Sequence, residues 1–186
     1  MKKMKEFRKI SVIGLGLIAS SICLTLRQKD PTIKLRGYDK DKVVRNRAKK
    51  IGLCEVESNL DNAVSGSQLI VLCVPVGQMQ AVTRRLKKNI EPGTTITDVG
   101  SVKLSVIEEI ESNIESVGGK YVPSHPIAGT ERSGPDAGYA GLFEGRWCIL
   151  TPTRKTNKRA LNSLETFWKF LGCLLYTSDA ADDDVR

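Results

Sequence analysis

Histidine is almost absent from this sequence, and aromatic residues are scarce. The one histidine, His125, cannot form a multi-histidine metal site, so we expect no bound metal. Aromatic residues make up 5% of the chain and are not interleaved with its basic residues as in single-strand nucleic-acid binders. The net charge of +8 therefore suits a small anionic ligand, and we expect no nucleic-acid partner.

Paired cysteines and a processing signal are also lacking. The five cysteines, at positions 23, 54, 73, 148 and 173, form no CxxC pair, which is typical of reduced thiols. The apolar stretch 10–26 follows a basic N-terminus as in a signal peptide, but it contains Gly14 and Gly16 and no small-residue cleavage pattern follows it. We interpret it as a buried strand and helix of a cytoplasmic protein with no membrane partner.

Apolar runs alternate with helical stretches along the chain. This order predicts an α/β, doubly wound Rossmann fold with a mainly parallel sheet and helices on both faces. We expect strands at 9–13, 34–38, 69–74, 94–98, 121–124 and 147–150, and helices at 17–27, 42–51, 60–65, 76–88, 102–116 and 157–171. The Gly-rich stretch 126–145 is predicted to be a long loop, either functional or disordered.

The C-terminal residues do not continue the pattern of the last helix. We expect one dinucleotide-binding domain over residues 1–172 and a non-native or disordered tail over 173–186. The sequence from Cys173 resembles a translated sequencing adapter, which would make the gene incomplete at this point. The alternative is a natural acidic tail.

A glycine motif follows the first predicted strand and opens a helix: Gly14-Leu15-Gly16-Leu17-Ile18-Ala19. Gly14 permits a tight turn, and Gly16 leaves room for a pyrophosphate at the helix N-terminus, where free N–H groups favour anions. The motif is weak alone, but the strand before it and the helix after it are the context that it requires.

Asp39 closes the second predicted strand, 23 residues after Gly16. A carboxylate there accepts hydrogen bonds from the adenosine ribose and repels a 2′-phosphate, which favours NAD over NADP. The basic residues Lys40, Lys42 and Arg45 weaken this preference. The alternative interpretation of Asp39 is a helix N-cap.

Three further motifs lie where predicted strands end, at the edge at which ligands bind open α/β sheets. Val74-Pro75 ends a wholly apolar strand, which is alternatively a plain buried strand. Asp98-Val99-Gly100-Ser101 ends another, and Ser101 either donates to a ligand or caps the next helix. His125 follows a third, beside the Gly-rich loop, where a neutral imidazole can accept a proton from a hydroxyl that is being oxidised.

In this order, the motifs resemble the prephenate/arogenate dehydrogenase family over residues 9–172. The most specific parts are Asp98-Val99-Gly100-Ser101-Val102-Lys103 and the stretch from Ser124 through Gly129-Thr130-Glu131 to Leu142-Phe143-Glu144-Gly145. The resemblance implies NAD-dependent oxidative decarboxylation of prephenate to 4-hydroxyphenylpyruvate in tyrosine biosynthesis, or the corresponding reaction of arogenate. It implies that His125 contacts the ring hydroxyl, that Ser101 supports this contact, and that Glu131 belongs to a substrate-side loop.

The expected site residues follow from these motifs. The cofactor-binding residues are Gly14, Leu15, Gly16, Leu17, Ile18, Asp39, Val74, Pro75, Asp98 and Gly100. The catalytic residues are His125 and Ser101, and the substrate-binding residues are Ser101, His125, Gly129, Thr130 and Glu131.

The family's all-helical C-terminal domain has no counterpart in this sequence. The resemblance implies that this domain forms a homodimer and supplies the arginine for a substrate carboxylate. We therefore expect the truncated domain alone to be inactive, with Leu164, Phe167 and Phe170 of its last helix exposed. Two alternatives remain: another two-domain Rossmann dehydrogenase, which would need a catalytic lysine that is not apparent here, and a non-catalytic NAD-binding module, which would not need His125.

Overall fold

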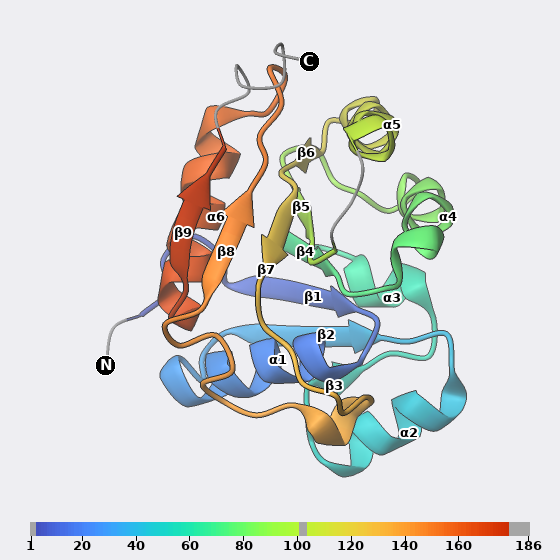
Figure 1. Cartoon of the computed structure of the whole chain (residues 1–186). Coiled ribbons are helices and arrows are strands. Elements are labelled where there is room, and N and C mark those ends of the chain that lie inside the picture. Colours follow the sequence, from blue (N-terminus) through green and yellow to red (C-terminus); the bar gives the residue numbers. More distant parts are fainter. Residues whose placement is uncertain (1–2, 101–103, 179–186) are drawn as a thin grey trace.

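A computed structural model describes residues 3–100 and 104–178 of the chain, and Figure 1 shows their arrangement. Its centre is a parallel six-stranded sheet in the order β3-β2-β1-β4-β5-β6. The strands are β1 (Lys9–Ile13), β2 (Lys34–Tyr38), β3 (Glu55–Val56), β4 (Leu69–Leu72), β5 (Thr95–Asp98) and β6 (Lys120–Tyr121). The predicted doubly wound α/β fold is confirmed.

Helices cover both faces of this sheet. They are α1 (Leu17–Lys29), α2 (Lys42–Lys50), α3 (Leu60–Val64), α4 (Val76–Leu86), α5 (Leu104–Glu115) and α6 (Lys158–Leu171). Side chains alternate between faces along a strand, so Val12 and Val71 pack into one core with α1 and α6. Ile13 and Ile70 pack into the other core with α3, α4 and α5. Two buried faces explain why β4 consists entirely of apolar residues.

A second sheet has three strands, β7 (Ser124–Pro126), β8 (Trp147–Leu150) and β9 (Leu174–Thr177), in that order. β7 is antiparallel to β8, and β9 is parallel to it. The single strand predicted at 121–124 is therefore two strands in two sheets. Pro123 lies between them and has no N–H group for a sheet ladder, which explains the break.

The segment from Cys173, which the sequence analysis expects to be non-native or disordered, is described as far as Ser178. Gly172 ends α6 with a left-handed backbone (φ +112°), so the chain turns at once toward β8. The amide of Leu174 donates to the carbonyl of Arg146 at 2.9 Å, and β9 continues this pairing. Residues 174–177 are thus a strand in the structure, whereas the origin of this segment stays a prediction.

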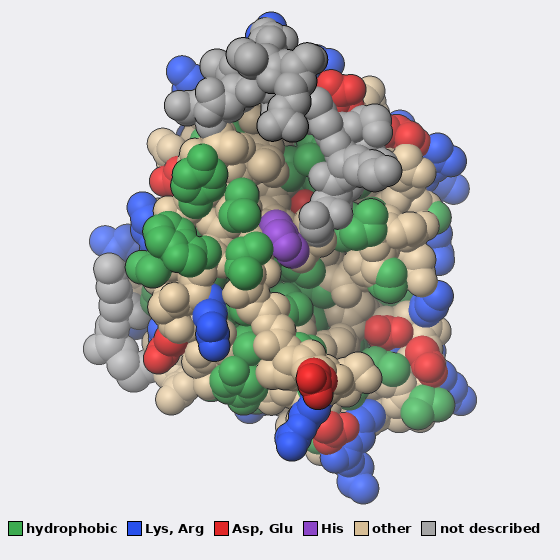
Figure 2. Space-filling model, in the orientation of Figure 1, with side chains coloured by type: hydrophobic (Ala, Val, Ile, Leu, Met, Phe, Trp, Pro, Cys, Tyr) green, Lys and Arg blue, Asp and Glu red, His purple; other side chains and the backbone are tan. Residues whose placement is uncertain are grey.

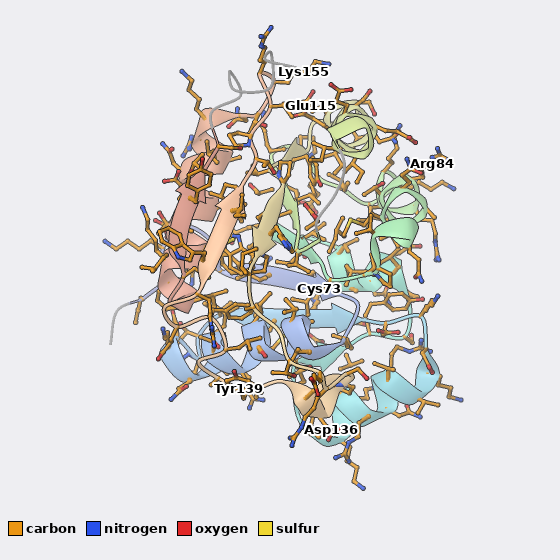
Figure 3. The ribbon with its side chains drawn as sticks, in the orientation of Figure 1. Cys73, Arg84, Glu115, Asp136, Tyr139 and Lys155 are labelled. Carbon is orange, nitrogen blue, oxygen red and sulfur yellow. The ribbon has the colours of Figure 1, made fainter. Side chains whose placement is uncertain are left out.

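The Gly-rich stretch 126–145 lies against helices α1 and α2. It contains a short 3-10 helix, η1 (Pro135–Ala137). The amide of Tyr139 donates to Ser21 Oγ on α1 at 3.2 Å, and Asp136 forms an ion pair with Arg47 on α2. Figure 3 labels Asp136 and Tyr139 on this segment, below the central sheet. The predicted loop is therefore anchored on the helix that begins at the glycine motif.

The apolar side chains of α6 face inward. Leu164 and Phe167 are fully buried and Phe170 is partly buried, so the expectation that they are exposed is wrong. The N-terminal segment before β1 covers them: the ring of Phe7 meets that of Phe167 edge to face, with centroids 6.3 Å apart. This chain thus covers the apolar face of α6 by itself.

Candidate active site

A cavity of about 510 Å³ opens where the strand order changes direction, at the carboxyl ends of β1 and β4. Connections from neighbouring strands diverge to opposite faces at such a point, which leaves a crevice for a ligand. The lining residues come from the ends of β1, β2 and β4 and from α3 and α4: Ile13, Gly14, Gly16, Tyr38, Asp39, Lys40, Leu60, Cys73, Val74, Pro75, Gln78, Ala81, Val82 and Arg85. Figure 3 labels Cys73 close to the end of β1.

The glycine motif forms the tight turn between β1 and α1. Gly14 has φ +91°, and a Cβ atom on it would lie 2.6 Å from the carbonyl oxygen of Cys73, so no other residue fits. Gly16 is the N-cap of α1 and gives no side-chain cap, and a Cβ on it would meet nothing within 4 Å. The first turn of α1 therefore presents N–H groups to open space, as a phosphate site requires.

Asp39 lies at the end of β2 and borders the same cavity. Its Oδ2 accepts from the Leu15 amide at 2.9 Å, and its Oδ1 accepts from the Asp41 amide at 2.9 Å. The N-cap of α2 is Asp41, which accepts from the Val43 amide, so the alternative role of Asp39 as a helix cap is wrong. Each carboxylate oxygen retains a lone pair, and the half-exposed side chain can still accept from ribose hydroxyls.

Arg45 lies beside Asp39 but is held by the backbone. One of its guanidinium nitrogens donates to the carbonyls of Asp39 and Lys40, at 2.6 and 3.0 Å. The guanidinium carbon also lies 5.6 Å from the centroid of the Tyr38 ring. These bonds hold the guanidinium group next to Asp39 and Lys40, which line the cavity.

Val74 and Pro75 form part of the cavity wall, and Gly100 packs behind them against α4. Val74 and Pro75 line the cavity, and Pro75 is the N-cap of α4. A Cβ on Gly100 would lie 2.8 Å from Met79 Cε and 3.0 Å from Val76 Cγ2, so glycine lets this loop pack closely against α4. These residues have no polar side-chain atoms, so they give the site its shape and offer a ligand no side-chain hydrogen bond.

Asp98 is fully buried beneath this edge, away from the cavity. Its Oδ1 accepts from the Tyr121 hydroxyl at 2.8 Å and the Ser124 amide at 3.3 Å, and its Oδ2 accepts from the Gly100 amide at 3.0 Å. Burial raises the pKa of Asp98 to about 6, although these hydrogen bonds act in the opposite direction. Because Asp98 is buried and does not line the cavity, the structure does not bring this carboxylate to a ligand as the sequence predicts.

His125 lies on β7, half-buried, and borders a second cavity of about 370 Å³ with Pro126, Ile127, Ala128, Gly129 and Arg146. Its Nδ1 is 3.3 Å from the carbonyl oxygen of Val99. A carbonyl only accepts, so this bond requires the proton on Nδ1 and leaves Nε2 as an acceptor. Figure 2 shows the histidine at the surface, with hydrophobic side chains around it.

The remaining predicted site residues are only partly placed. Gly129 borders the cavity of His125, whereas Thr130 and Glu131 are exposed beyond it and line neither cavity. Ser101 lies outside the described residues.

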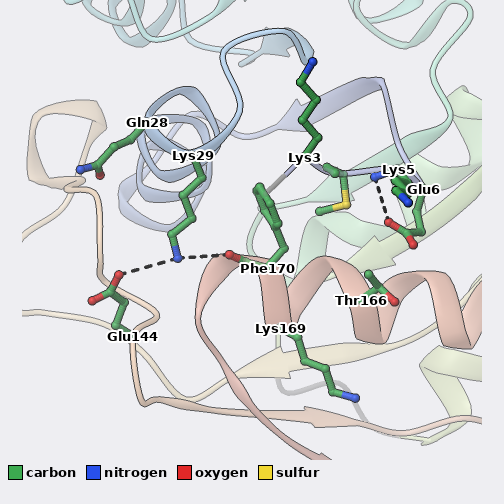
Figure 4. A pocket seen from close by; sticks show the side chains of 10 residues that line it. Lys3, Lys5, Glu6, Gln28, Lys29, Glu144, Thr166, Lys169 and Phe170 are labelled. Carbon is green, nitrogen blue, oxygen red and sulfur yellow. Dashed lines mark hydrogen bonds and ion pairs between the residues drawn. The ribbon is translucent and has the colours of Figure 1, made fainter. Parts of the chain in front are cut away.

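A larger cavity, about 930 Å³, lies at the opposite end of β1 and is lined by none of the predicted residues. Figure 4 shows Lys29 reaching across it. The Lys29 Nζ donates to the carbonyl of Phe170 at 3.2 Å and is 3.7 Å from the carboxylate of Glu144. Lys29 thus ties the C-terminal ends of α1 and α6 together, and we assign this cavity a structural origin.

The comparison of the chain with protein families supplies the decisive observation. Residues 22–177 match the model described as "Prephenate dehydrogenase, nucleotide-binding domain". The chain belongs to this family. The match confirms the resemblance found from the sequence, and it begins after β1 and the glycine turn.

Several known proteins resemble this chain over nearly its whole length. A cyclohexadienyl dehydrogenase from Zymomonas mobilis is 39% identical over 170 residues, which are 91% of this chain and 57% of that protein. The prephenate dehydrogenase of Aquifex aeolicus, solved with hydroxyphenyl propionate and NAD+, superposes with a TM-score of 0.85 at 28% identity, over 96% of this chain and 62% of that one. Synechocystis arogenate dehydrogenase superposes with a TM-score of 0.84 at 28% identity, over 95% and 61%. The chain thus spans about three fifths of the length of these relatives.

Sequence reasoning missed one charged residue at the candidate site. Arg146 borders the cavity of His125, because the loop before β8 lies alongside β7 through a 2.7 Å bond from the Ile127 amide to the Trp147 carbonyl. Its only signal in the sequence is its place directly before a predicted strand. In the described part of the chain, no group of three or more His, Cys, Asp or Glu could hold a metal, and no helix is long and apolar enough to cross a membrane.

Proposed function

We propose that this chain is the NAD-binding part of a cytoplasmic dehydrogenase that oxidatively decarboxylates prephenate or arogenate. The observation that carries the proposal is the arrangement of three groups. The open N-terminus of α1 and the carboxylate of Asp39 follow the carboxyl ends of β1 and β2, and the imidazole of His125 contacts the loop that follows β5. The longer protein is expected to form a homodimer through its part beyond this chain. The Aquifex relative, solved with NAD+ and a hydroxyphenyl acid, supports the choice of ligands.

The residues around the crevice fit a dinucleotide. Gly16 leaves open space where a side chain would block a pyrophosphate, and the uncapped first turn of α1 supplies N–H donors. The carboxylate of Asp39 is held by the Leu15 amide, directly beside this turn, where it can accept from ribose hydroxyls. Val74 and Pro75 give the crevice an apolar wall. When bound, NAD+ supplies the hydride acceptor.

The imidazole of His125 fits the role of the base. The ring carbon that carries the 4-hydroxyl loses hydride, and the hydroxyl proton moves to the free Nε2 of His125. The ring carboxylate then leaves as carbon dioxide, and its bonding electrons make the ring aromatic. The oxygen takes a proton back to become a phenol, so the imidazole returns to its neutral form.

Charge complementarity supports an anionic substrate. Arg146 is the only ionisable neighbour of His125 among the residues that line the smaller cavity. Prephenate carries two carboxylates and arogenate also carries carboxylates, and a guanidinium group binds such groups with two parallel hydrogen bonds. Arg146 is therefore proposed to hold one substrate carboxylate within reach of the base.

Substitution of the base tests the proposal. In a protein extended to the length of the relatives, His125→Asn should lower kcat by about two to four orders of magnitude, the usual contribution of a positioned acid or base. The affinity for NAD+, measured by calorimetry on the same preparation, should stay unchanged because His125 lines the other cavity. A variant with nearly normal kcat would contradict the assigned chemistry.

A further inference from the structure

The bond between the His125 side chain and the Val99 carbonyl joins two segments of the chain that are 26 residues apart in the sequence. Val99 lies in the loop after β5, and His125 lies on β7, in the other sheet. The length of this bond, 3.3 Å, depends on how these segments are held relative to each other. Without it, the imidazole would be free to carry its proton on Nε2, which is the form that an unrestrained histidine side chain favours.

One buried carboxylate holds both segments. Oδ2 of Asp98 accepts from the amide of Gly100, the residue that follows Val99, and Oδ1 accepts from the amide of Ser124, the residue that precedes His125. The hydroxyl of Ser124 returns a bond of 2.7 Å to the carbonyl of Asp98. The side chain of Asp98 therefore links Gly100 and Ser124, which are the chain neighbours of Val99 and His125.

The surroundings make this arrangement rigid. Ser124 Oγ is also bonded to Thr97 Oγ1 at 2.8 Å and to the indole N–H of Trp168 at 3.2 Å, and the Tyr121 hydroxyl donates to Asp98. All of these side chains are buried. A buried network whose members are all bonded permits few alternative arrangements.

We propose that Asp98 is a positioning residue that sets the tautomer of His125, by clamping Gly100 and Ser124 so that the Val99 carbonyl accepts from Nδ1. Its contribution to the reaction is to leave Nε2 of the base as an acceptor, and it makes no contact with the cofactor. This inference rests on the proposed function of His125 only for its catalytic meaning, because the tautomer itself is a property of the chain without ligands.

The single histidine makes the test direct. In the 15N-labelled 186-residue chain, the long-range 15N–1H spectrum of imidazole rings contains one ring system, and its nitrogen shifts report which nitrogen carries the proton. At alkaline pH, with the ring neutral, the Nδ1–H form should predominate in the wild type. In Asp98→Asn, the Nδ1–H to Nε2–H ratio should fall severalfold, because the two backbone amides bond to different carboxylate oxygens and the Asn side chain has only one acceptor oxygen.

Tyr121→Phe is the matched control for damage to the core. It removes one partner of Asp98 but leaves both backbone amides bonded to the carboxylate, so the Nδ1–H form should persist. A tautomer that changes equally in both variants would show that Asp98 acts only through general packing. A wild type in which the Nε2–H form predominates would also overturn the proposal.

A second measurement needs no substitution and covers the case in which Asp98→Asn fails to fold. In the wild type, the amide protons of Gly100 and Ser124 should shift together with the carboxyl carbon of Asp98 as that group is protonated. Independent shifts would contradict the clamp. Neither measurement uses cofactor or substrate, so a failure of NAD+ binding or of turnover would contradict the proposed function and leave this result intact.

Discussion

At the scale of single residues, the carboxylate of Asp39 accepts a hydrogen bond from the backbone and can still accept hydrogen bonds from a ligand. Its carboxylate holds the Leu15 amide in the glycine turn and borders the crevice. The same charge opposes a second phosphate on the ribose, although Arg45 lies close by and is held by the carbonyls of Asp39 and Lys40. We therefore expect this carboxylate to set the cofactor preference, because Arg45 is already bonded to backbone carbonyls.

The chain should bind NAD+ more tightly than NADP+. Repulsion of the 2′-phosphate and the lost ribose hydrogen bonds together amount to roughly 1–3 kcal/mol, or about 5- to 150-fold in Kd. Asp39→Asn should narrow this difference, since the amide has no charge. Calorimetric titration of both nucleotides measures it, and equal affinities in the wild type would contradict the role of Asp39.

The buried carboxyl of Asp98 should leave a signature in the pH dependence of stability. Its folded pKa of about 6 exceeds the value of about 3.9 of an unfolded aspartate, so between these values the native state binds the extra proton. The contribution of Asp98 to stability therefore rises as the pH falls through 6. Between pH 7.5 and 4.5, the unfolding free energy of the wild type minus that of Asp98→Asn should grow by about 2 kcal/mol.

Urea unfolding of the two proteins at several pH values measures this difference. Other carboxyl groups titrate in both proteins and cancel in the subtraction, including Asp30, whose pKa is lowered by hydrogen bonds from Thr32 and Arg8. A difference that stays constant with pH would mean that Asp98 is ionised in the native state as readily as in the unfolded one.

At the scale of elements, the stretch 126–145 packs very closely against α1 at Gly138. A Cβ on Gly138 would lie 2.3 Å from Ser20 Cβ and 2.9 Å from the Ser21 amide nitrogen. Gly138→Ala should therefore separate the loop from the helix and lower the free energy of unfolding by about 1–3 kcal/mol. Chemical denaturation followed by circular dichroism measures the loss.

Gly129→Ala is the matched control, in the same stretch. A Cβ on Gly129 would meet nothing within 4 Å, so stability should change by less than about 0.5 kcal/mol. If Gly138→Ala were equally neutral, the stretch would not be anchored on α1 as the structure has it.

Strands with a clear hydrophobic pattern could be predicted from the sequence, because burial of one or both faces of a strand determines where its apolar residues fall. β1, β2 and β8 begin and end where the pattern places them. β3 has only two residues, Glu55 and Val56, and is too short to form a pattern. β7 and β9 depend on pairing with β8 across long distances in the sequence, which local periodicity does not record.

Some features of the candidate site could likewise be predicted from the sequence, and others could not. The glycine turn, Asp39 and His125 could be located because each follows a predicted strand at the ligand-binding edge. The burial of Asp98 and the approach of Arg146 to His125 could not, because they depend on tertiary packing between the two sheets.

At the scale of the whole molecule, the cofactor crevice is well walled but the substrate side is open. Ile127, which lines the cavity of His125, and Trp147, whose carbonyl accepts from the Ile127 amide, are 48% and 52% exposed. Hydride transfer needs the reacting atoms held at about 3–3.5 Å, which an open half-site cannot enforce. We therefore expect the 186-residue chain to bind NAD+ but to produce no measurable NADH from prephenate or arogenate.

An absorbance assay for NADH at saturating substrate checks this expectation, with NAD+ binding by calorimetry as proof that the domain is folded. Robust turnover by the chain alone would show that the described residues form a complete active site.

The edge-to-face contact between Phe7 and Phe167 has a consequence for how the chain acquires its structure. It joins residues at nearly opposite ends of the described sequence, and α6 covers a face of the sheet to which β1 contributes Ile10 and Val12. During synthesis this face of the sheet remains exposed to water until α6 has left the ribosome. The domain therefore cannot complete its core as each strand is made. Contacts of such high sequence separation slow folding, because the intervening chain must be ordered first. Throughout this interval the nascent protein exposes an apolar surface that chaperones recognise.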